Sequence, residues 1–314
     1  MIDIVITGGT GMVGKCIKEY IDKSPYKPQI KATFLSSRDL DLTKRNDVLE
    51  YFKNNEHEYI IHLAANVGGL YKNMAGNIEM FGSNIKINEN VLEACHLNNI
   101  NRGIFCLSSC IYPANPGKFP MDETMIHEGP PHSSNEGYAY AKRMLEMQCR
   151  HYNNSFNREY ICVVPVNLYG PHDNFNLRDG HLIPMLMHRF HLSKSYDVVS
   201  AYGTGKPLRQ FLYAPDFAKI IIKILFEYVE TSPIICCTDK EYTIKELVLK
   251  VMDTMNMDQE KLTWLTDKSD GVMKKTVSNK KLVKLFSNLE FTSLDEGLKY
   301  TYDWFVANYD SVRK

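Results

Sequence analysis

The sequence has no excess of either charge, since 37 Lys and Arg residues balance 37 Asp and Glu residues. Without a net field, the chain as a whole is not expected to bind a nucleic-acid backbone or an anionic membrane, and any anion must be bound locally. The sequence also lacks a run of roughly 20 apolar residues, the length that crosses a bilayer. Its most apolar helical stretch, residues 218–229, carries Lys219, Lys223 and Glu227. We therefore predict no nucleic-acid partner and no membrane segment.

The cysteines have no CxxC spacing, which argues against a zinc site and against a disulfide framework. They are Cys16, Cys95, Cys106, Cys110, Cys149, Cys162, Cys236 and Cys237. The N-terminal stretch, residues 1–7, lacks a basic segment before its short apolar run, so it predicts a strand and not a signal peptide. We expect reduced thiols, no metal site and a cytoplasmic location.

The hydrophobic residues, 44% of the 314 positions, can form a sizeable core. A chain of this length exceeds the size at which one core usually stops growing, so two lobes with a cleft are expected. Apolar runs and helical periodicity alternate along the first half. The predicted strands are 4–6, 32–35, 59–64, 103–107 and 160–166, and the predicted helices are 12–21, 44–53, 84–98 and 138–152. This alternation predicts an α/β fold, a doubly wound Rossmann sheet, mostly parallel, with a second, smaller α/β domain.

The pattern changes after residue 168 to irregular segments rich in Asn, His and Gly. A helix at 216–228 and a strand at 233–237 still fit the first sheet, whereas helices at 243–255 and 293–308 fit the smaller lobe. We predict a first domain of residues 1–168 plus about 208–237. The second domain then comprises residues 169–207 and 238–314.

The first candidate site is the turn Gly8-Gly-Thr-Gly-Met-Val-Gly14, which joins a predicted strand to a predicted helix. Glycines at this spacing let the backbone approach a pyrophosphate, whose charge the helix N-terminus attracts. A glycine-rich turn without a ligand is the alternative. Arg38 follows the next strand, where this fold places the adenosine ribose of a dinucleotide. An arginine there favours NADP over NAD, unless its side chain is simply solvated.

The second candidate site pairs Tyr138 with Lys142, four residues apart on one face of a predicted helix. A cation beside a phenol lowers its pKa and makes it a usable proton donor or acceptor. Ser108, after the strand at 103–107, supplies a hydroxyl that polarises the same carbonyl oxygen. Either group alone is also compatible with a structural role, because YxxxK is common in helices and serine is common in turns.

Several longer strings extend these motifs along the chain. They are His62-Leu-Ala-Ala65, Val67-Gly-Gly69, Ser108-Ser-Cys-Ile-Tyr-Pro113, Asp122-Glu-Thr124, Asn167-Leu-Tyr-Gly-Pro-His-Asp-Asn174, Gly180-His-Leu-Ile-Pro184, Gly203-Thr-Gly205, Arg209-Gln-Phe211 and Lys268-Ser-Asp-Gly271. Together with the glycine turn and Tyr138-Ala-Tyr-Ala-Lys142, the sequence resembles the extended short-chain dehydrogenase/reductase family from end to end.

The resemblance implies a nucleotide-sugar enzyme that uses NADPH. Its implied substrate is GDP-4-keto-6-deoxymannose, which is epimerised at carbons 3 and 5 and then reduced at carbon 4. The resemblance offers Cys110 as the base and His181 as the acid of epimerisation, with Ser108 and Tyr138 stabilising the enediolate oxygen. Tyr138 then protonates that oxygen during reduction. Judged by residue type alone, Cys110 fits a core thiol and His181 a structural histidine.

The resemblance assigns site residues to the first, NADP-binding domain and to the second, nucleotide-sugar domain. The predicted catalytic residues are Ser108, Cys110, Tyr138, Lys142 and His181. The predicted cofactor-binding residues are Gly8, Gly9, Thr10, Gly11, Met12, Val13, Gly14, Arg38, Asp41, Ala64, Ala65, Leu107, Ser108, Tyr138, Lys142, Pro165, Asn167, Leu168 and His181. The predicted substrate-binding residues are Asn174, Arg189, Tyr202, Arg209, Asp270 and Lys275.

Two positions depart from the family pattern. Thr10 stands where some relatives carry Arg, so recognition of a 2′-phosphate depends more on Arg38. Tyr202 stands where relatives can carry Trp, which keeps an aromatic wall. A homodimer through the helices at 84–98 and 138–152 is also implied by the resemblance.

Two other functions fit parts of the sequence. A 4,6-dehydratase or 4-epimerase of the same family would keep its NAD within one turnover, but a dehydratase needs a carboxylate pair in place of Cys110 and His181. A non-catalytic dinucleotide sensor also fits the fold, because fold alone does not establish function. Such a sensor has no need to keep Ser108, Tyr138 and Lys142 together.

Overall fold

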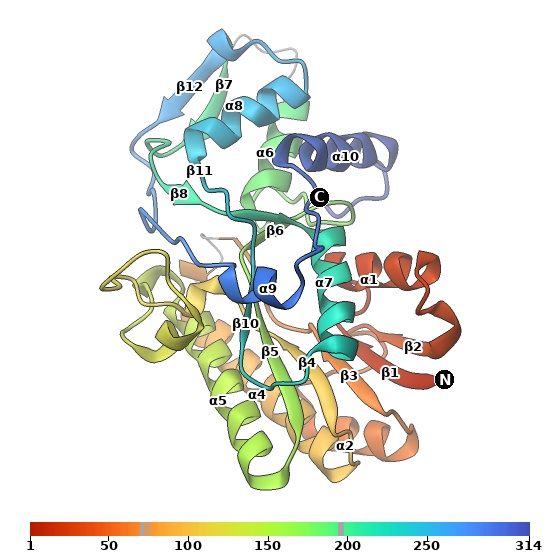
Figure 1. Cartoon of the computed structure of the whole chain (residues 1–314). Coiled ribbons are helices and arrows are strands. Elements are labelled where there is room, and N and C mark those ends of the chain that lie inside the picture. Colours follow the sequence, from red (N-terminus) through yellow and green to blue (C-terminus); the bar gives the residue numbers. More distant parts are fainter. Residues whose placement is uncertain (70–72, 75, 194–197) are drawn as a thin grey trace.

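A six-stranded parallel sheet forms the centre of the computed structural model, which describes residues 1–69, 73–74, 76–193 and 198–314 (Figure 1). Its order is β10-β5-β4-β3-β1-β2. The strands are β1 (Ile2–Thr7), β2 (Ile30–Leu35), β3 (Tyr59–His62), β4 (Arg102–Cys106), β5 (Glu159–Pro165) and β10 (Ile234–Cys236). Every neighbouring pair runs parallel. The predicted fold class is therefore confirmed, and β10 does return to the first sheet.

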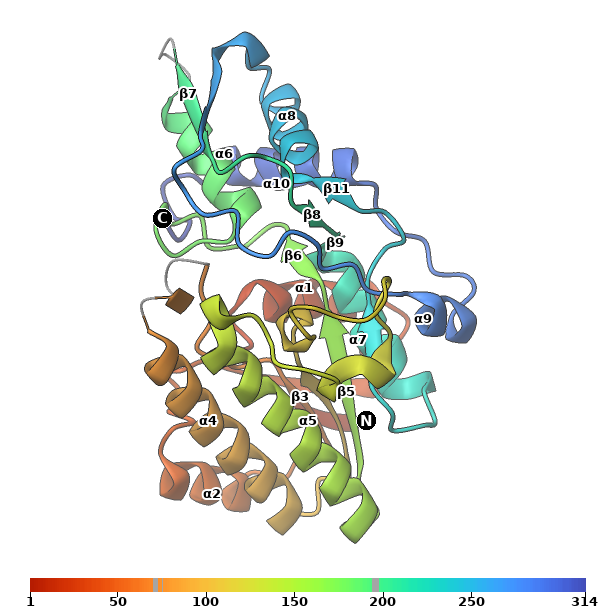
Figure 2. The same cartoon turned by 90° about the vertical axis from the view of Figure 1, so that its left-hand side faces the viewer.

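Helices cover both faces of this sheet, which explains why its strands are continuous apolar runs (Figure 2). On one face, α1 (Met12–Lys23) packs beside α7 (Ala214–Glu227). On the other face, α4 (Asn77–Leu97) packs between α2 (Arg45–Asn54) and α5 (Glu136–Phe156). Between the two layers, Ile4, Val5 and Ile6 of β1 are fully buried.

The strand order reverses between β1 and β3, because the chain runs outward from β1 to β2 and then returns to β3. Ligands of open α/β sheets bind at such a switch point, beyond the carboxyl ends of the strands. Here the glycine turn after β1 and Ala64-Ala65 after β3 lie side by side, since the Gly8 and Ala64 backbones are in close contact.

After β5, apart from α7, α9 (Lys280–Leu285) and β10, the chain forms smaller sheets and further helices beyond the carboxyl edge of the main sheet (Figure 1). Three strand pairs are present in this part: β6 (Asn167–Tyr169) with β9 (Phe211–Tyr213), β7 (Val199–Tyr202) with β12 (Leu262–Leu265), and β8 (Leu208–Arg209) with β11 (Tyr242–Thr243). The helices are α6 (Leu182–Leu192), α8 (Ile244–Thr254) and α10 (Leu294–Ala307). Short 3-10 turns lie at Lys27–Gln29, Ser109–Ile111, Glu123–His127, Ser133–Asn135 and Gln259–Lys261.

Helix α6 corrects the expectation of an irregular segment at this point. Pro184 stands in its first turn, where the missing N–H removes no intrahelical hydrogen bond, so the proline does not interrupt the helix. Three apolar side chains at helical spacing, Leu182, Met185 and Leu186, line a cavity described below.

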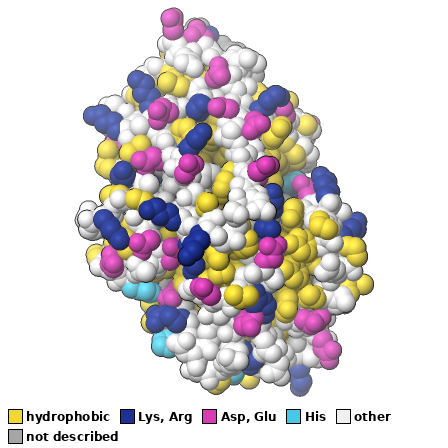
Figure 3. All heavy atoms as spheres, viewed as in Figure 1, with side chains coloured by type: hydrophobic (Ala, Val, Ile, Leu, Met, Phe, Trp, Pro, Cys, Tyr) yellow, Lys and Arg dark blue, Asp and Glu magenta, His cyan; other side chains and the backbone are white. Residues whose placement is uncertain are grey.

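The described residues form two hydrophobic cores. The first surrounds the main sheet, and the second is formed by residues of α6, α8, α10 and β7. Leu282 of α9 belongs to the first core although its sequence falls in the predicted second domain. Within the described residues, no helix combines the length and apolar character that a membrane span requires. Lys and Arg side chains lie among Asp and Glu side chains over the face shown in Figure 3.

Candidate active site

The glycine turn after β1 brings the backbone close to the N-terminus of α1. Gly8 has φ +70°, a left-handed conformation that favours glycine. A Cβ on Gly14 would lie 2.4 Å from the Gly9 carbonyl oxygen, so only glycine lets α1 start so close to the turn. Gly11, the residue before the helix, offers no side-chain cap to the first N–H groups of α1. These N–H groups can therefore bind an anion such as a pyrophosphate.

A cleft of about 670 Å³ runs from this turn across the carboxyl edge of the sheet. It is lined by all the predicted cofactor-binding residues except Gly9 and Arg38. Gly9 is buried, and its N–H donates to the carbonyl oxygen of Leu35 over 2.8 Å. The cleft has the chemistry that a dinucleotide requires, namely a glycine turn at one side and open backbone N–H groups at a helix start.

Beyond β2, the cleft wall consists of Ser36 and Ser37, and the Arg38 side chain is exposed beside it. The Asp39 carboxylate accepts hydrogen bonds from the Ser36 N–H and Oγ over 2.8 and 2.6 Å, which lower the pKa of Asp39. Asp41, which lines this end of the cleft, likewise accepts from the N–H and the hydroxyl of Thr43 over 3.0 and 2.7 Å. Both carboxylates are thus engaged by neighbouring residues. Arg38 supplies the positive charge of this turn.

Lys142 and Tyr138 lie where the α5 spacing predicts, but their electrostatics differ from the prediction. Lys142 is buried, donates to the carbonyl oxygen of Cys106 over 2.7 Å, and has its Nζ 5.9 Å from the centre of the Tyr138 ring. Burial raises the pKa of Tyr138 well above its usual value, and the Cys110 and Cys106 thiols add to that rise. The expected lowering of this pKa is not seen, because burial of the phenol is the largest effect. Tyr138 is consequently a protonated donor at neutral pH.

Cys110 lies in the short turn Ser109–Ile111, which Ser108 caps by accepting the Cys110 N–H over 3.4 Å. Its thiol is buried, and burial raises its pKa. Lys275, Ser108 and Lys142 act in the opposite direction and favour the thiolate. Cys110 is therefore a buried thiol with two cations near enough to assist its ionisation, unlike a thiol in a purely apolar core.

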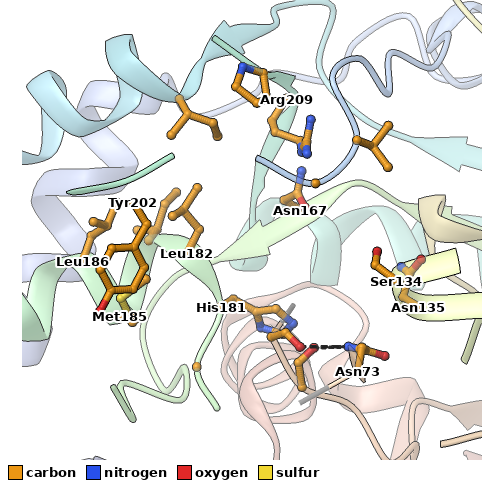
Figure 4. Close-up of a pocket in the computed structure, with 18 of the residues that line it drawn as sticks. Asn73, Ser134, Asn135, Asn167, His181, Leu182, Met185, Leu186, Tyr202 and Arg209 are labelled. Carbon is orange, nitrogen blue, oxygen red and sulfur yellow. Dashed lines mark hydrogen bonds between the residues drawn. The ribbon is translucent and has the colours of Figure 1, made fainter. Parts of the chain in front are cut away.

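A second cavity of about 690 Å³ extends from Cys110 into the second half of the chain. In the view of Figure 4, His181 and Asn73 lie at one side of it, Arg209 lies opposite, and Asn167 lies between them. Its positively charged lining residues are Arg178, Arg189, Arg209, Lys268 and Lys275, and Asp270 adds a carboxylate. Such a lining suits an anionic ligand that carries phosphate groups.

An aromatic wall borders this cavity, as expected for Tyr202. The guanidinium carbon of Arg189 lies 4.0 Å from the centre of the Tyr202 ring. Asp270 accepts from the backbone N–H and from the hydroxyl of Thr204, both over 2.7 Å, and so holds the turn at Gly203–Gly205. These contacts fix the far end of the cavity, where a base or ribose can be recognised.

The cleft and the cavity meet at the residues predicted to be catalytic. Ser108, Tyr138, His181 and Lys275 line both spaces, Cys110 lines the cavity, and Lys142 lines the cleft. His181 reaches this junction because it is the residue that precedes α6. The five residues predicted to be catalytic, scattered over more than 70 positions, are thus brought together.

Asn174 lies in a different place from the one predicted, and three other lining residues were not predicted. Asn174 was predicted to contact substrate, but it lines the cleft. Asn73, Asp173 and Arg313 were not predicted, although Asn73 lines the cavity and the other two line the cleft. Asp173 was visible as part of a quoted string, whereas a lone arginine near the end of the chain carries no motif that could have marked it.

A buried polar network lies behind the junction. Thr7 Oγ1 is 2.7 Å from Nδ1 of His62, and Nε2 of His62 is 3.2 Å from Oδ1 of Asn88. Burial lowers the pKa of His62 to about 3, with a smaller contribution from Lys142. The imidazole is neutral, so Nε2 donates to Asn88 and Nδ1 accepts from Thr7.

A doubly wound sheet whose glycine turn opens a cleft, with a serine, a tyrosine and a lysine at its end, defines the short-chain dehydrogenase/reductase class. A model of the NAD dependent epimerase/dehydratase family matches residues 4–235. The chain belongs to this family, which confirms the resemblance seen in the sequence.

Similar proteins cover the chain from end to end. A GDP-L-fucose synthase of Dictyostelium discoideum is 44% identical over 99% of this chain and 97% of its own length. A probable GDP-L-fucose synthase of Drosophila melanogaster is 39% identical over the full length of both chains. The crystal structure of a GDP-L-fucose synthetase from Naegleria fowleri bound to NADP has 38% identity and a TM-score of 0.90, covering 100% of this chain and 95% of that chain.

Proposed function

We propose that this chain catalyses the GDP-L-fucose synthase reaction, converting GDP-4-keto-6-deoxy-D-mannose to GDP-L-fucose with NADPH. The main support for the proposal is that the cofactor cleft and the cationic cavity meet at Ser108, Tyr138 and His181. One space has the features of a dinucleotide cleft, and the other has a cationic lining that suits a nucleoside diphosphate. Full-length relatives that carry this name, at 39–44% identity, support the same activity.

In this proposal, epimerisation uses the acidity of carbons 3 and 5, which both adjoin the keto group. The Cys110 thiolate removes a carbon-bound proton, and His181 supplies a proton to the other face. Lys275 and Lys142 favour the thiolate, as their effect on the Cys110 pKa indicates. Ser108 and Tyr138 donate hydrogen bonds to the enediolate oxygen, so charge on that oxygen is stabilised at the moment it develops.

Reduction uses the same oxygen site. When bound in the cleft, NADPH supplies a hydride to carbon 4. Tyr138, which burial keeps protonated, gives its phenolic proton to the oxygen on that carbon. Lys142 is held by the Cys106 carbonyl and keeps a positive charge behind the phenol, which stabilises the negative charge left on it.

For substrate binding, we propose that the GDP moiety occupies the end of the cavity remote from His181. Arg209 and Arg189 are the candidates for the diphosphate, and the Arg189–Tyr202 pair offers a flat surface on which a guanine can stack. Asp270 and Lys275 complete the predicted set, with Lys275 closer to the sugar because it also lines the cofactor cleft. Asn174 faces the cofactor in this arrangement.

The direct test is incubation with GDP-4-keto-6-deoxy-D-mannose and NADPH, followed by identification of the product. We expect one NADPH to be oxidised for each GDP-L-fucose formed. A 4-epimerase or dehydratase would keep its coenzyme within the turnover, so product formation without net NADPH oxidation would refute the proposal and favour that alternative.

We also propose that the chain forms a homodimer through α4 and α5, which pack side by side on one face of the sheet. The exposed large apolar side chains of these helices are Ile78, Phe81, Leu97 and Phe156. Exposed apolar side chains along two neighbouring helices are compatible with a self-association surface. Light scattering should give a mass twice that of one chain. Phe81→Glu should shift the measured mass toward that of the monomer. Val229→Glu, at an exposed site after α7, is the control that should leave it unchanged.

A further inference from the structure

Arg313 has an exposed side chain, but hydrogen bonds and packing hold the backbone at and before this residue. Val312 is buried in the second core, and its N–H donates to the Asn308 carbonyl oxygen over 3.0 Å. The Arg313 carbonyl oxygen accepts from the Phe175 N–H over 2.8 Å. A backbone held in this way gives the guanidinium a defined starting point in spite of its exposure.

Arg313 is one of the residues that line the cofactor cleft. Its Nη2 donates to the His172 carbonyl oxygen over 3.0 Å. A guanidinium carries five N–H donors, so this bond leaves others available for a ligand. The planar shape of the group suits the paired oxygens of a phosphate.

The contacts of His172 connect Arg313 with α1, the helix that begins after the glycine turn. Nε2 of His172 lies 2.7 Å from Oε1 of Glu19 on α1, the helix whose N-terminus faces the glycine turn. The cleft residues beyond β2, around Ser36 and Ser37, mark the opposite, adenosine end. Arg313 lines the cleft, whereas Arg38 lies outside its lining, next to Ser37 at the adenosine end.

Carboxylates in the cleft give the positive charge of Arg313 a role in anion binding. Asp173 and Asp179 line the same cleft as Arg313, and ionised carboxylates there repel a pyrophosphate. Asp173 is nine-tenths buried, and its Oδ2 has no hydrogen-bond partner within the described part of the chain. Burial raises the pKa of Asp173, whereas the nearby His181 and Arg313 act in the opposite direction. Arg313 is therefore close enough to this carboxylate to favour its ionised form. Without Arg313, the pyrophosphate would face the two carboxylates with one fewer compensating cation.

We propose that Arg313, supplied by the second lobe, binds the pyrophosphate of the dinucleotide opposite the glycine turn. This inference rests on the proposed use of a dinucleotide by this chain and adds a binding residue to it. It also gives the second lobe a direct part in holding the cofactor. Because pyrophosphate is common to NADPH and NADH, Arg313 should contribute equally to the binding of both, unlike a residue that recognises the 2′-phosphate.

The test measures the dissociation constants of NADPH and NADH by quenching of protein fluorescence. Arg313→Gln should raise both constants by about tenfold, the size expected for loss of a charge-assisted hydrogen bond. Arg313→Lys, which keeps the charge but not the planar group, should recover part of the loss. The matched control is Lys314→Gln, because Lys314 donates to the Tyr309 carbonyl oxygen over 2.8 Å and lies over that ring. Its constants should stay within about twofold of the unmodified chain.

Unchanged constants in Arg313→Gln would overturn this inference and leave the proposed function standing. A loss confined to NADPH would also overturn it, since that pattern assigns Arg313 to the 2′-phosphate. If the unmodified chain bound neither dinucleotide, that result would refute the proposed function, and this inference would be refuted as well. The two failures are therefore distinguishable.

Discussion

Tyr138 is a buried phenol. Its proton determines how reduction responds to mutation, and its burial determines how reduction responds to pH. Tyr138→Phe removes the proton but keeps the ring, so NADPH should still bind while reduction falls by about 10²- to 10⁴-fold. Because burial raises the pKa of Tyr138 well above its usual value, the phenol stays protonated as the pH rises through 9. The rate of reduction should therefore not decline between pH 7 and pH 9 through loss of this proton. A fall of less than about tenfold in Tyr138→Phe would assign the proton to another group.

Cys110 can be tested separately because only epimerisation moves carbon-bound protons. Cys110→Ser replaces a thiol with a hydroxyl that is a far weaker base. In deuterated water without coenzyme, the unmodified chain should place deuterium at carbons 3 and 5 of the keto sugar, and Cys110→Ser should place little at either. With NADPH, the variant should still reduce unepimerised sugar slowly. Normal deuterium incorporation would show that Cys110 is a packed core thiol.

Arg38 is the residue on which the choice between coenzymes depends. Its guanidinium is exposed beside Ser37, and Asp39 in the same turn is engaged by Ser36. Arg38→Ala should therefore raise the KM for NADPH and leave that for NADH nearly unchanged, which narrows the preference. Steady-state kinetics with both coenzymes measure this ratio. Equal efficiency with both in the unmodified chain would contradict the assignment.

The part of the site that the sequence could predict consists of residues within motifs. The glycine turn, Tyr138 with Lys142, and Ser108 stand at spacings fixed by the geometry of one turn or one helix. Arg313 and Asn73 are single residues brought to the site by tertiary packing, so no spacing marked them. The pKa of Tyr138 was predicted in the wrong direction, because the burial of the phenol depends on neighbours from several elements.

At the scale of elements, the buried network of Thr7, His62 and Asn88 joins β1, β3 and α4 behind the junction. Histidine has a pKa near 6.5 in an unfolded chain, whereas His62 has a pKa of about 3 in the fold. Between these values the unfolded chain binds a proton that the folded chain does not. The contribution of His62 to the free energy of unfolding is therefore full above pH 6.5 and is lost as the pH falls toward 3.

His62→Gln should remove this pH dependence while lowering stability overall. From pH 7 to pH 5, the unmodified chain should lose about 2 kcal/mol of unfolding free energy more than the variant loses, since one pH unit corresponds to about 1.4 kcal/mol. Urea denaturation at both pH values measures the difference, and other titrating groups cancel in the comparison. Parallel losses in the two proteins would show that His62 does not stay neutral in the fold.

The sequence predicted best the longer helices and strands, in which one hydrophobic pattern runs through the whole element. The strands of the main sheet and helices α5, α8 and α10 lie within a few residues of their predicted positions. The start of α4 was placed seven residues too late, at 84 in place of Asn77. Gly82 weakens the helical pattern in this first stretch, although the packing of α4 against α2 and α5 stabilises it. Strands of two residues, such as β8, leave no periodicity to detect.

At the scale of the whole molecule, the chain crosses between its two cores several times. Gln210, buried between β8 and β9, accepts the Val277 N–H over 2.8 Å and donates to the Thr238 carbonyl oxygen over 3.0 Å. Leu282 then packs on the first core. The division at residue 168 stays a prediction, and these crossings indicate that the two parts depend on each other for stability.

The two tryptophans make this dependence measurable, because Trp264 and Trp304 both pack against the second core. Tryptophan fluorescence therefore reports the second core, whereas the circular dichroism of the helices reports both. If the cores unfold together, urea curves from the two probes should coincide, as a cooperative transition requires. Saturating NADPH should shift both curves equally, by about 2.7 kcal/mol at a hundred times its dissociation constant, because residues of both lobes line its cleft. A fluorescence transition at lower urea would instead show that the second lobe unfolds independently and that its contacts with the cofactor are not needed for the first lobe to remain folded.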